Sequence, residues 1–318
     1  MARRRLTGIF SGSWLAQACY ASVKLGLPDL LAAGPRTADE LAATTGANPH
    51  ALLRLLRALA TAGVYRADGP RSFGLTPVSE LLRTGAPGAG HLLALMQGEE
   101  MFRSFAEIMH TVRTGQPAFE KVHGQSFYAY LDDHPVTATT FNESMGGQPV
   151  PAALSTCDLS GVRSLVDVGG GNGTLLAAVL AGHPEIRGTL LERPDALRAA
   201  RTRLAAAGLA DRVDFVEGSF FDGVPAGGDR YVLARVLHNW TDPRALEILG
   251  NIRRAMAPGG RLIVLEDFTD TAPGLVDLLM LVVLEGFERS EAEYHELLRS
   301  AGFEILGSRP GVVEAGPE

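Results

Sequence analysis

The sequence predicts an α/β domain built on a mostly parallel sheet, preceded by a mainly α-helical part. From residue 164 onward, strand-like apolar runs alternate with helical stretches, at 164–168, 188–192, 213–217, 230–234 and 261–266. This alternation is typical of a parallel sheet with helices on both faces. A length of 318 residues suits two domains. We expect three parts: residues 1–85, a helical middle over 86–155 and the α/β domain over 156–318.

The first 85 residues combine helices with one hairpin. Leu52, Leu55, Leu56 and Leu59 recur at the spacing of one buried helix face. Thr37 and Glu40 are spaced as a capping box before a short helix. Residues 64–66 and 73–76 flank a turn and predict a small hairpin. Helices followed by a hairpin form a winged-helix-like pattern.

A winged helix suggests two roles, DNA binding or a contact between protein chains. The second helix, 50–61, offers Arg54 and Arg57 but is otherwise mostly Leu and Ala. A recognition helix needs several polar side chains that reach base edges. The net charge of -7 also lacks the positive field of a nucleic-acid binder. We therefore favour a structural or dimerisation role and expect no nucleic-acid partner.

The composition indicates a cytoplasmic protein. Cys19 and Cys157 are too few for a disulfide scaffold or a metal cluster, and they suit a reducing compartment. The apolar stretch 275–284 contains Asp277 and is shorter than a membrane span. The N-terminus has a basic start but only a weak apolar region. We expect neither a membrane segment nor a signal peptide.

A glycine-rich loop follows the first predicted strand. Asp167 precedes Gly169, Gly171 and Gly173 in the order D-x-G-x-G-x-G, where glycines permit tight turns and close approach to a ligand. The dinucleotide fingerprint G-x-G-x-x-G fails in both reading frames. A nucleoside with a cationic amino-acid tail suits this acid better than a pyrophosphate does. A plain tight turn is the alternative interpretation.

Two later strand ends supply further candidates for binding that nucleoside. Glu192, roughly 20 residues after the loop, can accept hydrogen bonds from both ribose hydroxyls. Ser219 can hydrogen-bond a base, and Phe220 can cover the face of that base. The alternatives are a solvated strand end for Glu192 and an ordinary turn for Ser219 and Phe220.

His238 follows the fourth predicted strand. Ligands of such sheets lie beyond the carboxyl ends of the strands, so His238 should lie beside the glycine loop. A neutral imidazole titrates near physiological pH and is a competent general base. A structural or surface histidine is the alternative.

Five segments together resemble one family. The sequence resembles the bacterial and plant small-molecule O-methyltransferases at VDVGGGNGT, LLERPDAL, EGSFFDGVPAGGD, RVLHNWTD and APGGRLIVLED. It also resembles them near the start, at LAATTGANPHALLRLLRALATAGV. The resemblance covers nearly the whole chain. It implies a Rossmann-like domain with a seven-stranded sheet, a winged-helix-like dimerisation domain and a homodimer. It also implies S-adenosylmethionine as cofactor, S-adenosylhomocysteine as product and no metal.

The resemblance also assigns roles to residues. It makes His238 the general base, flanked by Glu266 of VLED and Glu288 of GFERS, and it places Arg193 and Arg235 at the cofactor. This chain departs from the family at three positions. Asn239 replaces the usual Asp after the histidine, Ser219 replaces an acid of the third motif, and Glu285 replaces a glycine before Glu288.

The acceptor side is less defined by sequence. Met145 in FNESM resembles the methionine of the family segment F-N-x-x-M, which lines the acceptor pocket. Further candidates, for each of which core packing is the alternative, are Phe102, Phe105, Met109, Asn142, Asn239, Met280 and Val283. In the resemblance, Tyr20 reaches the partner's pocket in the dimer. His91, His110, His123 and His134 show no metal-ligand spacing.

We therefore expect an S-adenosylmethionine-dependent O-methyltransferase that acts on a small aromatic molecule. Relatives that perform hydroxylation or a pericyclic step, and N-methyltransferases, are alternatives within the family. A regulatory DNA-binding protein is the alternative outside it. The presence of His238, Glu266 and Glu288 favours methyl transfer.

Overall fold

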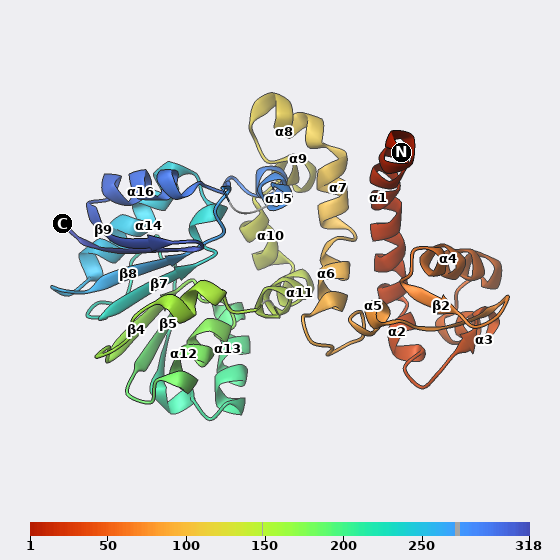
Figure 1. Ribbon diagram of the computed structural model, residues 1–318, viewed down its shortest axis with the longest axis horizontal. Helices are drawn as coiled ribbons and strands as arrows, with labels where there is room; N and C mark the ends of the chain where they lie inside the picture. Colours follow the sequence, from red (N-terminus) through yellow and green to blue (C-terminus); the bar gives the residue numbers. More distant parts are fainter. Residues whose placement is uncertain (148, 271–273) are drawn as a thin grey trace. The chain divides into compact units, whose positions relative to one another are not determined.

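The computed structural model describes residues 1–147, 149–270 and 274–318 (Figure 1). Its contacts divide the chain into two compact units, Met1–Arg103 and Ser104–Glu318. The boundaries 85/86 and 155/156 stay predictions. Among the helices of the described residues, none is long and apolar enough to cross a membrane.

The first unit is mainly helical with a small antiparallel sheet of order β1-β3-β2. Its elements are α1 (Ala2–Lys24), α2 (Leu27–Leu30), β1 (Arg36–Thr37), α3 (Ala38–Thr45), α4 (Pro49–Thr61), β2 (Tyr65–Ala67), β3 (Ser72–Leu75), α5 (Pro77–Glu80), α6 (Gly90–Met96) and the start of α7 (Glu100–Ala106).

The predicted capping box and hairpin are confirmed. The side chain of Thr37 accepts a hydrogen bond from Glu40 N, and Glu40 bonds the backbone of Thr37 in return. Strands β2 and β3 form the hairpin. The buried face of α4 differs in one position: Leu55 is only partly buried, whereas Leu53 is buried. The buried stripe of α4 thus keeps Leu52, Leu56 and Leu59 and is rotated toward Leu53.

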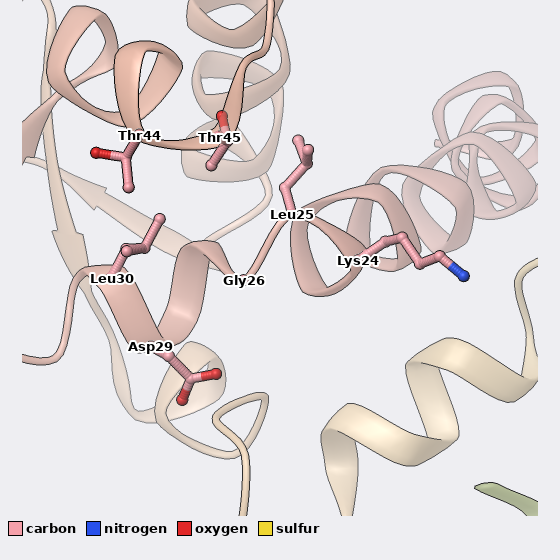
Figure 2. A pocket seen from close by; sticks show the side chains of 7 residues that line it. All are labelled: Lys24, Leu25, Gly26, Asp29, Leu30, Thr44 and Thr45. Carbon is pink, nitrogen blue, oxygen red and sulfur yellow. The ribbon is translucent and has the colours of Figure 1, made fainter. Parts of the chain in front are cut away.

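A hollow of about 420 Å³ lies within the first unit (Figure 2). It is lined by Lys24, Leu25, Gly26, Asp29, Leu30, Thr44 and Thr45. The Asp29 carboxylate accepts hydrogen bonds from the backbone and hydroxyl of Thr84. This acid therefore braces the chain around α2, and the hollow contains no predicted site residue.

The second unit is built on a seven-stranded sheet of order β6-β5-β4-β7-β8-β10-β9. Strands β4 to β8 are parallel, and β10 runs antiparallel to both its neighbours. The strands are β4 (Ser164–Val168), β5 (Arg187–Glu192), β6 (Val213–Glu217), β7 (Arg230–Ala234), β8 (Arg261–Leu265), β9 (Phe303–Arg309) and β10 (Val312–Pro317). The predicted Rossmann-like α/β class is confirmed.

Helices cover both faces of this sheet (Figure 1). The helices of the second unit are α8 (Ile108–Thr114), α9 (Ala118–His123), α10 (Phe127–Asp133), α11 (Pro135–Gly146), α12 (Thr174–Gly182), α13 (Pro194–Ala206), α14 (Asp242–Ala255), α15 (Leu275–Val283) and α16 (Glu291–Ser300), with 3-10 turns Ala152–Thr156, Ala210–Arg212 and Leu237–Asn239. Of these, α12 and α13 pack on one face of the sheet, and α14 and α16 pack on the other. Leu165 faces α12 and α13, whereas Val166 faces α14 and α16. This alternation along each strand places an apolar core on either side of the sheet.

Candidate functional site

The strand order reverses its direction between β4 and β7. From β4 the chain winds outward through β5 and β6, and then returns to place β7 on the other side of β4. Ligands of open α/β sheets bind at such a reversal. The glycine loop leaves β4 here and the segment with His238 leaves β7, so topology brings the two predicted motifs together.

The glycine loop is open to a ligand at its centre. Gly169 and Gly171 have φ angles of 70° and 58°, which favour glycine. A Cβ at Gly171 would meet nothing within 4 Å, whereas one at Gly169 would lie 3.2 Å from the Phe220 ring. Glycine at these positions thus permits the turn, and at Gly169 it also admits Phe220.

Asp167 is a buried acid without a partner. Its side chain has 0% exposure, and neither carboxyl oxygen has a hydrogen-bond partner in the described chain. Burial, together with the nearby charge of Glu192, raises the pKa of Asp167 to about 7. An unpartnered buried carboxyl is costly, and a cation placed at this loop would relieve that cost.

Glu192 ends β5 and supports the same loop. Its Oε2 accepts a hydrogen bond from Gly171 N at 2.9 Å, and its Oε1 accepts one from Arg193 N at 2.8 Å. Burial raises the pKa of Glu192, and these backbone donors partly offset that effect. Each carboxylate oxygen can accept more than one hydrogen bond, so Glu192 retains capacity for a ligand.

The other predicted cofactor residues lie around this loop. The Ser219 hydroxyl accepts a hydrogen bond from Phe221 N at 3.1 Å, and the Asn251 amide donates to the carbonyls of Phe220 and Phe221. The guanidinium of Arg193 bonds the carboxylate of Asp132. The turn that presents Phe220 to the glycine loop is therefore fixed by hydrogen bonds.

These features fit S-adenosylmethionine, which the family resemblance implies. The loop offers open space above Gly171, a carboxylate at Glu192 and a buried, unpaired acid at Asp167. A nucleoside with a cationic tail matches this set, because its hydroxyls can donate and its charge is opposite to that of the acids.

His238 lies in the 3-10 turn Leu237–Asn239, between two buried glutamates. Its Nδ1 is 2.7 Å from Glu288 Oε1 and 3.8 Å from Glu266 Oε2. Glu266 Oε1 also accepts hydrogen bonds from Val236 N and Leu237 N, at 3.0 and 2.8 Å. The two carboxylates thus orient both the imidazole and the backbone that carries it.

The environment favours the protonated imidazole. Burial alone would lower the pKa of His238, but the charge of Glu266 and the hydrogen bond to Glu288 outweigh burial, so the pKa is raised. Burial also raises the pKa of Glu266. Within the described chain the Nε2 atom of His238 has no hydrogen-bond partner, which leaves it available to a ligand.

The segment before His238 has an unusual backbone. Arg235 has a φ of 56°, a left-handed conformation that is uncommon for a non-glycine residue. Its guanidinium donates to the Pro149 carbonyl, and its own carbonyl accepts a hydrogen bond from the Asn239 amide at 3.1 Å. The aspartate usual in the family lacks this donor when ionised, so the departure at Asn239 supports the strained residue.

The departure at Glu285 leaves Glu288 in contact with His238. Glu285 is exposed. Gly286 lies so close to the turn that a Cβ there would overlap the His238 carbonyl and the backbone of Asn239. The glycine that follows Glu285 therefore permits the close approach.

The predicted acceptor residues belong to both units and to several helices. Phe102 belongs to the first unit and is exposed, and Met109 is 52% exposed on α8. Phe105 is partly buried, and Met280 is buried on α15. Two predicted residues lie on α11: Met145 is 38% exposed, and Asn142 donates to Asp195 Oδ2. Outside α11, Val283 is buried on α15, and Tyr20 in the first unit donates to Glu99. Their roles stay predictions.

Several residues around the site escaped the sequence analysis. Tyr128 stacks on Trp240 with ring centroids 5.5 Å apart, and Asp277 accepts a hydrogen bond from Glu288 N. Arg289, next to Glu288, is only 1% exposed. Its place in the GFERS segment is a signal that could have drawn attention to it. Among the described residues, no three His, Cys, Asp or Glu side chains are arranged to hold a metal.

Comparisons with known proteins agree with this fold. The O-methyltransferase domain model matches residues 105–304, and the O-methyltransferase dimerisation domain model matches residues 7–85. Phenazine O-methyltransferase PhzM of Lysobacter antibioticus is 41% identical over 98% of this chain and 95% of its own. An 8-amino-8-demethylriboflavin N,N-dimethyltransferase of Streptomyces davaonensis is 39% identical over 92% and 87%.

One relative has been solved with both a cofactor and an aromatic molecule bound. The O-methyltransferase NcsB1 from neocarzinostatin biosynthesis was solved with S-adenosylmethionine and 2-hydroxy-5-methyl naphthoic acid. Its TM-score to this chain is 0.86 at 36% identity, with 95% and 96% of the two chains covered. With both domain models matched in order, this chain belongs to the family of S-adenosylmethionine-dependent O-methyltransferases with an N-terminal dimerisation domain.

Proposed function

We propose that this methyltransferase transfers a methyl group to a hydroxyl group of a small aromatic natural product, with His238 as the general base. The observation that carries the proposal is the His238 imidazole, held by Glu288 at 2.7 Å on Nδ1 while Nε2 has no partner in the described chain. Glu266 and Glu288 are the proposed catalytic partners of this base.

Bound S-adenosylmethionine supplies a methyl group that its sulfonium already activates for transfer. The proposed binding residues are those of the glycine loop and of the strand ends around it. Glu192 would accept from ribose hydroxyls, Asp167 would face the cationic tail, and Phe220 would lie against the base. Gly169, Gly171 and Gly173 would shape the loop, and Arg193, Ser219 and Arg235 complete the proposed cofactor set.

His238 would take the acceptor's proton on Nε2 while Nδ1–H donates to Glu288. The carboxylate fixes the tautomer and stabilises the imidazolium that forms, as a buried acid does in other histidine-dependent sites. A positioned base contributes about 10² to 10⁴ in rate. Alignment of the acceptor oxygen with the methyl group increases the rate further, because binding offsets the entropy that is lost when the two reactants are brought together.

The acceptor class follows from relatives and from side-chain chemistry. One relative is named a phenazine O-methyltransferase, and another was solved with a hydroxylated naphthoic acid. Met145 and Met280 offer flexible, polarisable surfaces that suit flat rings. Phe102, Phe105, Met109, Asn142 and Asn239 complete the proposed acceptor set. An amino acceptor is the second candidate, favoured by the relative named as an N,N-dimethyltransferase.

Acceptor-dependent release of S-adenosylhomocysteine tests the function. We expect release with hydroxylated polycyclic aromatics, and a rate at least about tenfold lower in His238→Ala, because the base is lost. Matched anilines in the same panel separate oxygen from nitrogen acceptors. Calorimetric binding of S-adenosylhomocysteine is the control and should stay unchanged in His238→Ala. An unchanged rate in that variant would exclude His238 as the base.

A second prediction concerns the effect of the buried Asp167 on the free energy of unfolding. The raised pKa of Asp167, about 7, means that the folded state binds a proton more tightly than the unfolded state does. Stability from this group is therefore lost as pH rises through about 7. Asp167→Asn should stabilise the cofactor-free protein, and this advantage should grow by roughly 2 kcal/mol from about pH 5 to about pH 8.

Urea unfolding at both pH values measures this difference. Calorimetry should show weaker S-adenosylmethionine binding by the same variant, since the acid that faces the cationic tail is gone. A stability difference that does not change with pH would contradict the assignment of a raised pKa to Asp167.

We further propose that two copies associate through α1, most of which lies in the segment 7–85 matched by the dimerisation model. Four large apolar side chains of α1 are strongly exposed: Leu6, Ile9, Phe10 and Trp14, at 51%, 65%, 63% and 73%. Their spacing of three and four residues places them along one side of the helix. A contiguous exposed apolar stripe of this kind marks an interaction surface.

Light scattering after size exclusion should give the mass of a dimer. The double variant Phe10→Ser/Trp14→Ser should shift the population toward monomer, because the buried apolar area is lost. Val136→Ser is the matched control, since Val136 on α11 is 80% exposed and lies outside the matched dimerisation segment. A monomeric wild type, or a dimer unaffected by the double variant, would refute the contact.

A further inference from the structure

Arg289 is a buried charged side chain close to the proposed base. It is 1% exposed. It does not bond the imidazole of His238, because that contact is made by its neighbour Glu288. A buried guanidinium is retained only where its donors are satisfied, so its partners indicate what it holds in place.

The guanidinium of Arg289 donates hydrogen bonds to both ends of the turn that carries His238. Nη1 donates to the Leu237 carbonyl at 3.0 Å, and Nη2 donates to the Trp240 carbonyl at 2.8 Å. Nε and Nη2 both donate to Asp242 Oδ1, at 3.0 and 2.7 Å. One planar group thus joins the residue before His238 to the start of α14.

The backbone around Arg289 is anchored separately. Glu288 N donates to Asp277 Oδ1 at 2.9 Å, and the Arg289 carbonyl accepts a hydrogen bond from Thr269 N at 3.1 Å. Gly286 packs directly on the His238 backbone, with no room for a Cβ. The guanidinium therefore connects the turn of His238 to the segment around Arg289, whose own backbone is held by other hydrogen bonds.

We propose, on the basis of the function proposed above, that Arg289 is the positioning residue that sets the contact between His238 and Glu288. Glu288 is adjacent in the chain and bonds the imidazole, whereas Arg289 holds the carbonyls on either side of that imidazole. The planar fork of arginine can bridge several acceptors at once, and the single ammonium of lysine cannot reproduce this geometry.

The test compares Arg289→Lys, which keeps the charge, with Arg212→Lys. Arg212 is the matched control because its guanidinium also donates to three backbone carbonyls, those of Leu180, His183 and Ile186. These partners lie at the amino ends of the strands, the edge opposite to the site. Both variants lose a guanidinium that braces backbone, but only Arg289→Lys should disturb His238.

The readout is the titration of His238 followed by NMR of ring-labelled histidine, with the signal assigned by its loss in His238→Asn. The charged groups that face His238 are Glu266, Glu288 and Arg235, and Arg289→Lys leaves all three in the chain. Loosening the contact with Glu288 removes a cause that raises the pKa, so the midpoint should move to lower pH. Arg212→Lys should leave it unchanged.

Kinetics give the second readout. In Arg289→Lys we expect kcat to fall about 10- to 100-fold because the base is misplaced, while KM for S-adenosylmethionine changes less than about threefold. In a Glu288→Gln background, the same substitution should lower kcat much less, because the effects of two residues that act through one contact are not additive. Equal costs in both backgrounds would contradict the proposal.

Thermal unfolding separates positioning from stability. If Arg289→Lys lowers Tm as Arg212→Lys does but leaves the His238 titration and kcat unchanged, Arg289 is only structural and the proposal is overturned. Should Arg289→Lys fail to fold, Asp242→Asn decides. The Asp242 side chain is 58% exposed and is not among the charged groups that face His238. A smaller shift in the same direction is expected, and no shift refutes the proposal.

The NMR titration also keeps this proposal separate from the proposed function. It needs neither cofactor nor acceptor. A wild-type protein that transfers no methyl group to any acceptor would contradict the function, yet its His238 titration would still show whether Arg289 sets the contact with Glu288.

Discussion

The hydrogen bond between His238 Nδ1 and Glu288 Oε1, at 2.7 Å in a buried setting, is the interaction on which the account of this site depends. It joins a turn after β7 to a segment some fifty residues later. Because Nδ1 is engaged, Nε2 is left as the free nitrogen. The strand order, the close approach at Gly286 and the hydrogen bonds of Glu266 all serve to bring these two side chains together.

The site concentrates buried acids that a stable fold would otherwise avoid. Burial raises the pKa of Asp167, Glu192 and Glu266, which means that each carboxylate costs stability when it ionises. The apolar cores on both faces of the sheet offset that cost. The acids lie at the glycine loop and beside the imidazole, where the proposed function requires negative charge before any ligand binds.

Much of the fold was predictable because its signals are local. The strands 164–168, 213–217 and 230–234 have the predicted bounds. The first and third are buried, mostly apolar runs, as is typical of parallel strands, whereas 213–217 is a partly exposed edge strand in which Asp214 interrupts the apolar residues. Strands β9 and β10 were not delimited, because FEILGSR and VVEAGP mix charged residues, Gly and Pro with apolar ones. Residues at strand ends were likewise predictable, since topology gathers them. The partners of Arg289 and Asn239 were not, because they depend on how distant loops pack.

The most direct test of the central claim is a crystal structure of the protein with S-adenosylhomocysteine and an acceptor that it methylates. The account predicts that the acceptor's reacting oxygen lies within about 2.6 to 3.2 Å of His238 Nε2, while Nδ1 stays bonded to Glu288. An acceptor whose reacting atom lies out of reach of Nε2, with another side chain in hydrogen-bond contact, would contradict the account.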